Sequence, residues 1–376
     1  MEGALVKVLV TGSAGFIGRN LIERLKTGAC PEVTEILEFD RDTDPGLLAA
    51  YARECDFVFH LAGVNRPQNP AEFTEGNVAL TVMLLDALRA STPRPVVVTS
   101  SAQALRNNPY GVSKRGAEEA VAAYASETGA HAYVYRLPNV FGKWSRPNYN
   151  TVVATFCHNI ARDLPVEVSD PSAPITLVYI DDVVDEFLRA LVGHATEIQG
   201  EYVVPVTYDT TVGELAERIR GFQHSRENLA VPRSDDPLEK KLYATYLSFL
   251  EPRDFAYPLT MHRDQRGSFT EIIRTAERGQ FSVNVIKPGI TKGNHWHDTK
   301  NEKFVVVSGE GVIRFRKVGE TEVQEYFVSG ERMEVVDIPP GYTHNIENLG
   351  EADMITFMWA NEAFDPERPD THWLGV

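Results

Sequence analysis

Four side chains that commonly bind metals stand at close spacing in the last third of the chain. His295 and His297 are two residues apart, Glu302 follows five residues later, and His344 comes from a separate segment. Residues two apart on a strand point the same way, so both histidines can face one ion while Glu302 and His344 approach from neighbouring strands. Three imidazoles and a carboxylate suit Zn²⁺, and also Fe, Mn, Ni or Co. The spacing therefore predicts a divalent metal site and leaves the metal open.

A tyrosine and a lysine four residues apart form a second candidate site. Tyr110 and Lys114 share one face of a predicted helix, which brings the ammonium group near the phenol. A positive charge beside a phenol favours the phenolate and lowers the pKa of the tyrosine toward the working pH. Such a tyrosine can exchange a proton with a carbonyl or an alcohol. Ser100 and Ser101 end a predicted strand upstream, and either hydroxyl can bond the same oxygen. The same Tyr–Lys spacing also occurs on ordinary amphipathic helices.

A glycine-rich turn precedes both sites in the chain. Gly12, Gly15 and Gly18 directly follow a predicted strand and open a predicted helix, with Phe16 and Ile17 between the last two. Glycines at such a turn let the backbone approach a pyrophosphate, which then lies at the amide-rich N-terminus of the helix. The turn therefore predicts a dinucleotide-binding site.

Two charged residues end the second predicted strand, where a group that contacts the cofactor ribose belongs. Asp40 suits the 2′-hydroxyl of NAD, and Arg41 suits the 2′-phosphate of NADP. Both are present, so they leave the choice of cofactor open, and a solvated pair at a strand end is the alternative.

The elements that must position these groups fall into two patterns. In the first part of the chain, helical patterns separate most of the short apolar runs at 7–11, 35–40, 57–61, 96–100 and 132–137. Strands separated by helices predict an α/β fold with a doubly wound, Rossmann-like parallel sheet. Thr211 and Glu214 have capping-box spacing and open a helix to about residue 222, and Asp236 with Pro237 begins another toward residue 250.

After residue 250 the pattern changes. Pro252 and Pro258 interrupt any period, so we expect a linker over 251–262. Short strand-like runs separated by turns follow at 282–287, 303–308, 311–316, 323–328, 334–338 and 354–359. This pattern predicts a small all-β sandwich or barrel. We therefore expect two domains, residues 1–252 and residues 258–376.

Charge and composition narrow the classes of function. The chain has 37 basic and 53 acidic residues, a formal charge of −16, which argues against nucleic acid or an anionic membrane as the main partner. No apolar stretch approaches the roughly 20 residues that cross a bilayer, and the first apolar run contains Lys7, so we expect a strand rather than a signal peptide. The three scattered cysteines, Cys30, Cys55 and Cys157, predict buried free thiols in a cytoplasmic protein.

Together, the glycine turn, the strand-end serines and the Tyr–Lys pair resemble the extended short-chain dehydrogenase/reductase family over residues 7–250. In that family the tyrosine is the acid/base, the lysine holds the nicotinamide ribose and the serine polarises the carbonyl. The resemblance gives these roles to Tyr110, Lys114 and Ser101, with Ser100 as the alternative, since nine positions from Ser101 to Tyr110 is short for the extended type. It also implies cofactor contacts from Leu61, Ala62, Gly63, Asn77 and Asn139.

The histidine segments resemble both sequence motifs of the cupin family, over residues 258–376. The first motif spans 289–309 and the second 339–348, with Gly330 farther upstream than the pattern asks. The metal implied by this resemblance has two possible roles: a Lewis acid that stabilises an enediolate, or a structural ion. Four residues that border the motifs are candidate proton-transfer groups: Lys292, Asp298, Lys303 and Tyr342.

The whole chain resembles a two-domain family of bacterial capsular polysaccharide synthesis enzymes. The likeness rests on segments 61–67, 141–144, 147–150, 291–297 and 364–366. It implies a homodimeric, bifunctional enzyme acting on a UDP-linked 4-keto-6-deoxy-N-acetylhexosamine. The cupin half would epimerise C3, and the reductase half would reduce C4 with NADPH, preferred over NAD. The product would be UDP-N-acetyl-6-deoxy-L-talosamine, a precursor of N-acetyl-L-fucosamine.

The sequence leaves two other functions open. One is a nucleotide-sugar reductase only, with the cupin half as a metal-stabilised dimerisation or sugar-binding module. An iron cupin dioxygenase fused to a dehydrogenase is the third possibility, and it would consume oxygen with substrate.

Overall fold

The computed structural model describes residues 5–65, 67, 69, 71–149, 151–275, 277–367 and 369–376. Arg66 and Asn150, from two segments that carry the resemblance, lie outside the described residues. The chain divides into two compact units, one formed by Met1–Arg220 and Ser234–Leu250, the other by Gly221–Arg233 and Glu251–Val376. The ranges expected from the sequence differ from this division mainly at residues 221–233, which group with the second unit.

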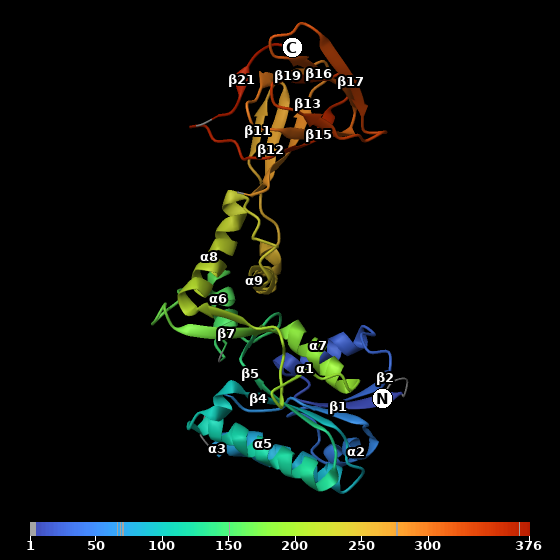
Figure 1. Cartoon of the computed structure of the whole chain (residues 1–376), viewed down its shortest axis with the longest axis vertical. Helices are drawn as coiled ribbons and strands as arrows, with labels where there is room; N and C mark the ends of the chain where they lie inside the picture. Colours follow the sequence, from blue (N-terminus) through green and yellow to red (C-terminus); the bar gives the residue numbers. More distant parts are fainter. Residues whose placement is uncertain are drawn as a thin grey trace. The chain divides into compact units, whose positions relative to one another are not determined.

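A seven-stranded sheet forms the centre of the first unit (Figure 1). Its strand order is β2-β1-β3-β4-β5-β9-β8, and every neighbouring pair is parallel except β8 and β9. β2 and β3 lie on opposite sides of β1, so the strand order reverses at β1. Ligands of such sheets bind beyond the carboxyl ends of the strands at this reversal. The strands are β1 (Val6–Thr11), β2 (Val33–Phe39), β3 (Phe57–His60), β4 (Val96–Ser101), β5 (Ala132–Leu137), β8 (Glu197–Ile198) and β9 (Glu201–Tyr202).

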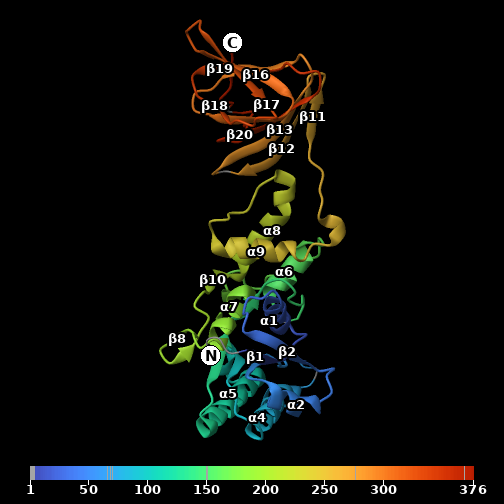
Figure 2. The ribbon, with the colours of Figure 1, turned by 90° about the vertical axis from the view of Figure 1, so that its right-hand side faces the viewer.

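Helices cover both faces of this sheet, with α1 and α7 on one face and α2, α4 and α5 on the other (Figures 1 and 2). Alternate residues of β1 explain this, because Val8 and Val10 pack with α1 and α7 while Leu9 packs with the opposite helices. The helices are α1 (Phe16–Lys26), α2 (Leu47–Glu54), α4 (Leu80–Arg89), α5 (Pro109–Thr128) and α7 (Ile180–Leu191). The predicted doubly wound α/β fold is confirmed.

Smaller elements complete the first unit. A second sheet has the order β10-β7-β6, in which β6 pairs parallel with β7 and β10 antiparallel. The predicted capping box forms, since the amide of Glu214 donates to the Thr211 hydroxyl and the amide of Thr211 to the Glu214 carboxylate. The elements are α3 (Ala71–Phe73), η1 (Thr74–Ala79), η2 (Ala102–Leu105), β6 (Asn139–Phe141), α6 (Val152–Ile160), β7 (Pro174–Tyr179), β10 (Tyr208–Thr211), α8 (Val212–Asn228), whose end belongs to the second unit, and α9 (Pro237–Leu247).

The second unit is built from two antiparallel sheets, with strand orders β11-β12-β13-β20-β15-β18 and β17-β16-β19-β14-β21. Apolar side chains from both sheets form one core, which includes Ile286, Phe304, Ile313 and Ile346. The strands are β11 (Met261–Asp264), β12 (Gly267–Thr275), β13 (Gly279–Ile286), β14 (Thr291–Trp296), β15 (Glu302–Ser308), β16 (Glu310–Lys317), β17 (Val323–Ser329), β18 (Val336–Ile338), β19 (Tyr342–Asn348), β20 (Met354–Ala360) and β21 (His372–Trp373). The predicted all-β second half is confirmed.

The expected linker over 251–262 is wrong in part. The short helix η3 (Pro252–Asp254) begins it, and β11, which starts at Met261, pairs antiparallel with β12 as an edge strand. All four residues of β11 are exposed, so the strand has no apolar alternation that would reveal it in the sequence.

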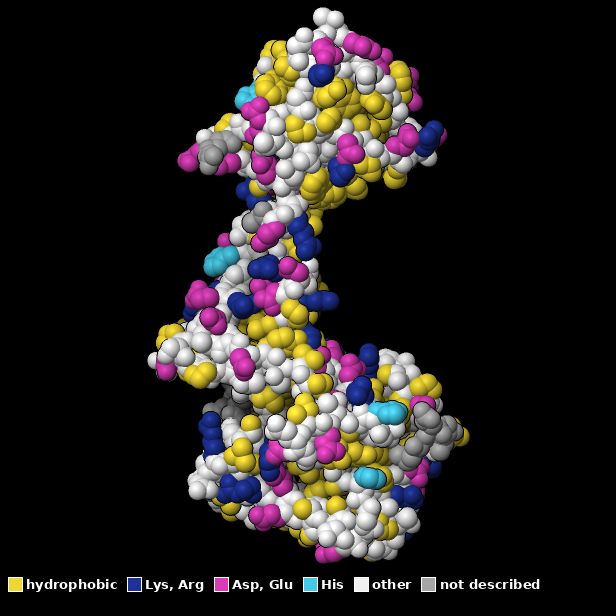
Figure 3. All heavy atoms as spheres, viewed as in Figure 1, with side chains coloured by type: hydrophobic (Ala, Val, Ile, Leu, Met, Phe, Trp, Pro, Cys, Tyr) yellow, Lys and Arg dark blue, Asp and Glu magenta, His cyan; other side chains and the backbone are white. Residues whose placement is uncertain are grey.

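Hydrophobic side chains gather on the side of the second unit where β17 lies (Figure 3). Among the exposed apolar residues on and beside this strand are Val323, Tyr326 and Phe327. Among the described helices, none combines the length and the apolar character needed to cross a membrane.

Candidate functional site

The glycine turn lies directly beyond the carboxyl end of β1. Gly12 has φ +72°, and a Cβ there would lie 2.6 Å from the backbone nitrogen of Ala62. A Cβ on Gly18 would lie 2.1 Å from the carbonyl oxygen of Gly12. Only glycine fits these positions, which keeps the turn tight against the N-terminus of α1. Gly15 caps that helix without a side-chain hydrogen bond, so the amides of Phe16 and Ile17 belong to an open helix N-terminus suited to a phosphate.

Asp40 and Arg41 follow β2 beside this turn. The Asp40 carboxylate accepts the amide of Ala14 at 2.8 Å and the amide of Arg41 at 2.7 Å. Asp40 thus tethers the glycine turn to the end of β2, a role additional to the expected ribose contact. The Arg41 side chain is exposed.

The segment after β3 contains the other expected cofactor residues of this edge. Leu61 donates its amide to the carbonyl of Thr11, which joins the ends of β1 and β3. Asn77, on η1, bonds both the amide and the carbonyl of Val64, and it donates to the Ser113 hydroxyl at 2.9 Å. A Cβ on Gly63 would lie 2.9 Å from Asn77 Oδ1 and 3.2 Å from Lys114 Nζ. Gly63 and its neighbour Ala62 therefore lie where the glycine turn meets α5.

Tyr110 and Lys114 lie one turn apart at the start of α5, which Asn108 caps through the amide of Gly111. Lys114 Nζ lies 5.9 Å from the centroid of the Tyr110 ring and donates to the carbonyl of Thr99 at 3.0 Å. Burial lowers the pKa of Lys114 to about 8. Burial raises the pKa of Tyr110, and a hydrogen bond to Ser101 offsets part of that rise. The expectation that Lys114 lowers the pKa of Tyr110 is therefore wrong, because desolvation dominates.

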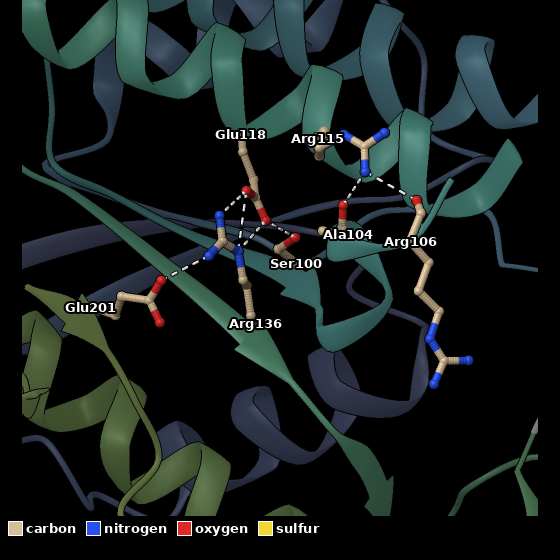
Figure 4. Close-up of polar contacts among 7 residues, drawn as sticks. All are labelled: Ser100, Ala104, Arg106, Arg115, Glu118, Arg136 and Glu201. Atoms are coloured by element: carbon tan, nitrogen blue, oxygen red, sulfur yellow. Dashed lines mark hydrogen bonds and ion pairs between the residues drawn. The ribbon is translucent and has the colours of Figure 1, made fainter. Parts of the chain in front are cut away.

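The two candidate serines differ in their partners. Ser101 bonds the side chain of Tyr110, whereas the Ser100 hydroxyl donates to the carboxylate of Glu118, one turn after Lys114 on α5 (Figure 4). Arg136 also binds Glu118, with its Nη2 at 2.7 Å, and its Nη1 reaches Glu201 at 2.8 Å. The geometry thus favours Ser101 over Ser100 as the tyrosine's partner.

Asn139 lies apart from these residues. It begins β6 in the three-stranded sheet, and its Nδ2 donates to the carbonyl of Thr176 at 3.1 Å. The described contacts hold it to β7 rather than to α5.

In the second unit, the four predicted ligands come together from three strands. His295 is in β14 and pairs with His344 in β19, while Glu302 begins β15 and His297 follows β14. Their ligand atoms all lie within 4.8 Å of one another. Glu302 Oε2 lies 3.6 Å from His297 Nε2 and 3.4 Å from His344 Nε2.

These residues fit a divalent cation. Nε2 of His297, Nε2 of His344 and Oε2 of Glu302 are buried and have no hydrogen-bond partner among the described residues. Burial lowers the pKa of His295 to about 4. Burial also disfavours the ionised form of Glu302, but His297 and His344 outweigh it and hold the pKa of this carboxyl well below its usual range. A neutral imidazole at His295 and an ionised carboxylate at Glu302 are forms that bind metal.

Asp370 supports this cluster from the C-terminal segment. Its backbone carbonyl accepts the Nδ1 proton of His297, which leaves Nε2 free to bind a metal. Its carboxylate accepts the amides of Asp298, Thr299 and Lys300 at 2.7–2.8 Å. One residue therefore fixes both the tautomer of a ligand and the turn between two ligands.

A cavity of about 590 Å³ opens beside the cluster, and both His295 and His344 line it. Of the four candidate proton-transfer groups, Lys292 lines this cavity. Asp298 instead bonds His372 at 3.0 Å, and Lys303 pairs with Asp337 in an exposed bridge. Tyr342 begins β19, outside the cavity lining.

Comparison with known proteins now adds to this geometry. Residues 8–204, more than half of the chain, match the NAD dependent epimerase/dehydratase family. The chain belongs to this family. Residues 262–372 match the polysaccharide biosynthesis C-terminal domain.

Relatives in the epimerase/dehydratase family cover the chain from end to end. A UDP-2-acetamido-2,6-beta-L-arabino-hexul-4-ose reductase of Pseudomonas aeruginosa is 47% identical over 373 residues, 99% of each chain. The crystal structure of the capsular polysaccharide assembling protein CapF from Staphylococcus aureus has a TM-score of 0.92 and 49% identity, over 98% of this chain and 100% of that one. The resemblance to two-domain capsular polysaccharide enzymes is thereby confirmed.

A more distant solved structure shares the fold of the first unit alone. The Bordetella bronchiseptica enzyme WbmF, solved in complex with NAD⁺ and UDP, has a TM-score of 0.55 and 21% identity, over 65% of this chain and 92% of that one.

Sequence reasoning missed three residues that support these sites. Asp370 holds His297 and the turn after it, Glu118 binds Ser100, and Asn284 bonds Lys292. No motif of the epimerase/dehydratase family or of the metal segments includes them. Glu118 alone carries a local signal, because it follows Lys114 by four residues on the same helix face.

Proposed function

We propose that this chain is a bifunctional enzyme of UDP-sugar metabolism in capsule synthesis. The first unit would reduce the C4 ketone of a UDP-linked 4-keto-6-deoxy-N-acetylhexosamine with NADPH, after the second unit has inverted C3. The observation that carries this proposal is the presence, in one chain, of a Ser101–Tyr110–Lys114 site next to a dinucleotide turn and of a His/Glu cluster beside a cavity. The reductase name of the relative that matches the full length supports it.

Each residue of the proposed reductase site has its own role in the reduction of the C4 ketone. A bound nicotinamide cofactor supplies the hydride. Tyr110 donates its hydroxyl proton to O4 as the carbonyl oxygen gains charge, and Ser101 orients that hydroxyl. Lys114, whose pKa falls to about 8 on burial, stands beside the phenol and binds the ribose. Gly12, Gly15 and Gly18 leave room for the pyrophosphate at α1, and Arg41 would bind the 2′-phosphate of NADPH.

The epimerase residues act on the carbon beside the ketone. A bound divalent ion, for which we propose zinc, supplies a Lewis acid for the ketone oxygen. His295, His297, Glu302 and His344 would hold it, and Asp370 keeps His297 in the required tautomer. A hydrogen beside a ketone is acidic enough for a positioned base to remove, and reprotonation of the other face inverts the centre.

Proton NMR of the ketosugar in heavy water tests both halves. Without NADPH, we expect deuterium to enter C3 while the ketone persists. With NADPH added, we expect a new proton signal at C4 to appear and the signals of the protons beside the ketone to shift. Reduction without any exchange at C3 would leave a reductase whose metal unit is not catalytic, and failure of both would overturn the proposal.

We also propose that the enzyme is cytoplasmic and forms a homodimer. Cys30, Cys55 and Cys157 are buried free thiols, which is typical of the reducing cytoplasm. We propose a homodimer, for which the exposed apolar side chains of β17 offer a surface. Sedimentation equilibrium measures the mass directly.

A further inference from the structure

Lys292 and His295 face the same cavity, although they lie three residues apart on β14. Successive side chains of a regular strand alternate between its faces, so residues three apart point in opposite directions. The register of β14 against β19 shifts between Gly293 and His295, and Asn294 has φ +64°. This bulge inserts the extra residue that turns Lys292 to the side of the metal ligands.

The bulge is held firmly in place. Gly293 has φ +105°, and a Cβ there would lie 2.9 Å from the Cα of Asn345. Asn294 accepts the side-chain amide of Asn345 at 3.0 Å through its Oδ1, and its carbonyl accepts the amide of Leu374 at 2.9 Å. A left-handed backbone at a residue other than glycine is costly, and such costs concentrate at functional sites. The strained backbone of the bulge therefore sets the direction in which the Lys292 side chain points.

Two neutral acceptors fix the amine of Lys292. Its Nζ donates to the Oδ1 of buried Asn284 at 2.8 Å and to the carbonyl of Val285 at 3.1 Å. A neutral amine has two N–H groups, and these two bonds use both, so its lone pair takes the remaining direction. Since Lys292 lines the cavity, that direction is available to a molecule bound there.

Burial, rather than the nearby charges, favours the neutral amine of Lys292. No carboxylate among the described residues lies within ion-pair distance of Nζ, and the nearby Asp264 is engaged by two guanidinium hydrogen bonds from Arg266. Burial lowers the pKa of Lys292, the charge of Asp264 opposes this shift, and the smaller effect of Arg266 adds to it. The charged and titratable groups that line the same cavity are His262, Arg263, Asp264, Arg266, His295 and His344.

We propose that Lys292 is the residue that removes the C3 proton of the ketosugar in the second unit, an inference that rests on the proposed function. The lone pair of Nζ takes the C3 proton, the C–H electron pair forms the C3–C4 double bond, and the carbonyl electron pair moves onto O4. Water in the cavity delivers a proton to the opposite face of C3 as the O4 electrons return. The ammonium of Lys292 then releases its proton to solvent, so only the configuration of C3 has changed.

Two substitutions separate the charge of Lys292 from its basicity. Lys292→Met removes the amine at similar length, and Lys292→Arg keeps a positive charge that cannot be given up at any working pH. In full-length protein, we expect both variants to lose deuterium incorporation at C3 by about 100-fold or more. Lys287→Met, which removes an exposed lysine of the same unit, should exchange at the wild-type rate.

Metal content and an amine rescue complete the test. Zinc per chain should stay at the wild-type level in both variants. In Lys292→Cys, the added thiol stands in the cavity lining while the native thiols are buried, so alkylation with bromoethylamine restores an amine there and should restore exchange. Exchange by zinc-loaded Lys292→Met within threefold of wild type would overturn the inference, as would a loss of zinc that added metal does not reverse. An absence of exchange in the wild type would instead refute the proposed epimerase function.

Discussion

At the scale of single residues, the reductase site depends on a balance at Tyr110. Desolvation keeps the phenol protonated, and the hydrogen bond to Ser101 limits the cost of ionising it. Lys114 is buried and its ammonium is only moderately favoured, since its pKa is about 8. A protonated phenol beside a lysine is the state needed to donate a proton to a ketone.

We predict that Tyr110→Phe abolishes reduction and leaves cofactor binding intact. The ring and its contact with Phe73 stay, while the proton and the bond to Ser101 are lost. The expected fall in kcat for NADPH oxidation is about 100- to 10,000-fold, typical of a lost general acid. Fluorescence titration with NADPH should give an unchanged Kd. Tyr51→Phe, a half-buried tyrosine on α2, serves as the control, and equal kcat values for the two variants would contradict the assignment.

The residues that carry chemistry were predictable because their motifs are short. His295 and His297 are two residues apart and Tyr110 and Lys114 lie within one helical turn, so local periodicity brings each pair together, while Glu302 follows at the start of the next strand. Asp370 was not predictable, because it meets His297 across 73 positions through a backbone carbonyl, which any residue type could offer. The role of its carboxylate could not be predicted either, because its partners are backbone amides that come together only in the folded turn at 298–300.

At the scale of elements, strands with strong apolar patterns were predictable and exposed edges were not. The buried strands β1, β3 and β4 are nearly continuous apolar runs, as expected for a parallel sheet covered on both faces. β11 pairs through its backbone and presents exposed side chains, so its sequence resembles a loop. The bulge in β14 depends on the register against β19, which the sequence of β14 cannot specify alone.

The glycine turn gives a prediction at this scale. In Gly18→Ala the new methyl would lie 2.1 Å from the carbonyl oxygen of Gly12, so the turn must move away from α1. We expect the free energy of unfolding of the first unit to fall by about 1–3 kcal/mol and the affinity for NADPH to fall as well. Denaturant unfolding and NADPH titration measure the two effects.

A glycine in open space provides the control for that substitution. The Cβ position of Gly221, inside α8, has nothing within 4 Å. Gly221→Ala should raise the stability by about 1 kcal/mol through helix propensity and leave the affinity for NADPH unchanged. Equal losses of affinity in both variants would show that the glycine turn does not bind the cofactor.

At the scale of the whole molecule, an acidic protein is proposed to bind two anionic ligands. The net charge of −16 opposes both NADPH and a UDP-sugar, so local groups must supply the attraction. In the first unit these are the helix N-terminus at α1 and Arg41. In the second unit, Arg263 and Arg266 line the cavity beside the metal ligands. NADPH in the first unit and the UDP-sugar at the epimerisation site of the second unit therefore each meet basic groups.

Metal removal tests whether the two activities are separable within one chain. His295 and His297 supply two of the four ligands, so the double variant His295→Ala/His297→Ala should lose its zinc, measured as metal per chain by mass spectrometry. Metal at 1,000 times its Kd stabilises a fold by about 4 kcal/mol, so the second unit should also unfold at a lower temperature.

In this variant we expect no deuterium at C3, because without the ion nothing polarises the ketone. Reduction of ketosugar already inverted at C3 should continue at the wild-type rate, since the Tyr110 site holds no part of this cluster. Zinc that stays stoichiometric in the variant would show that the ligand set is wrong, and a parallel loss of both activities would show that the metal supports the whole enzyme rather than one reaction.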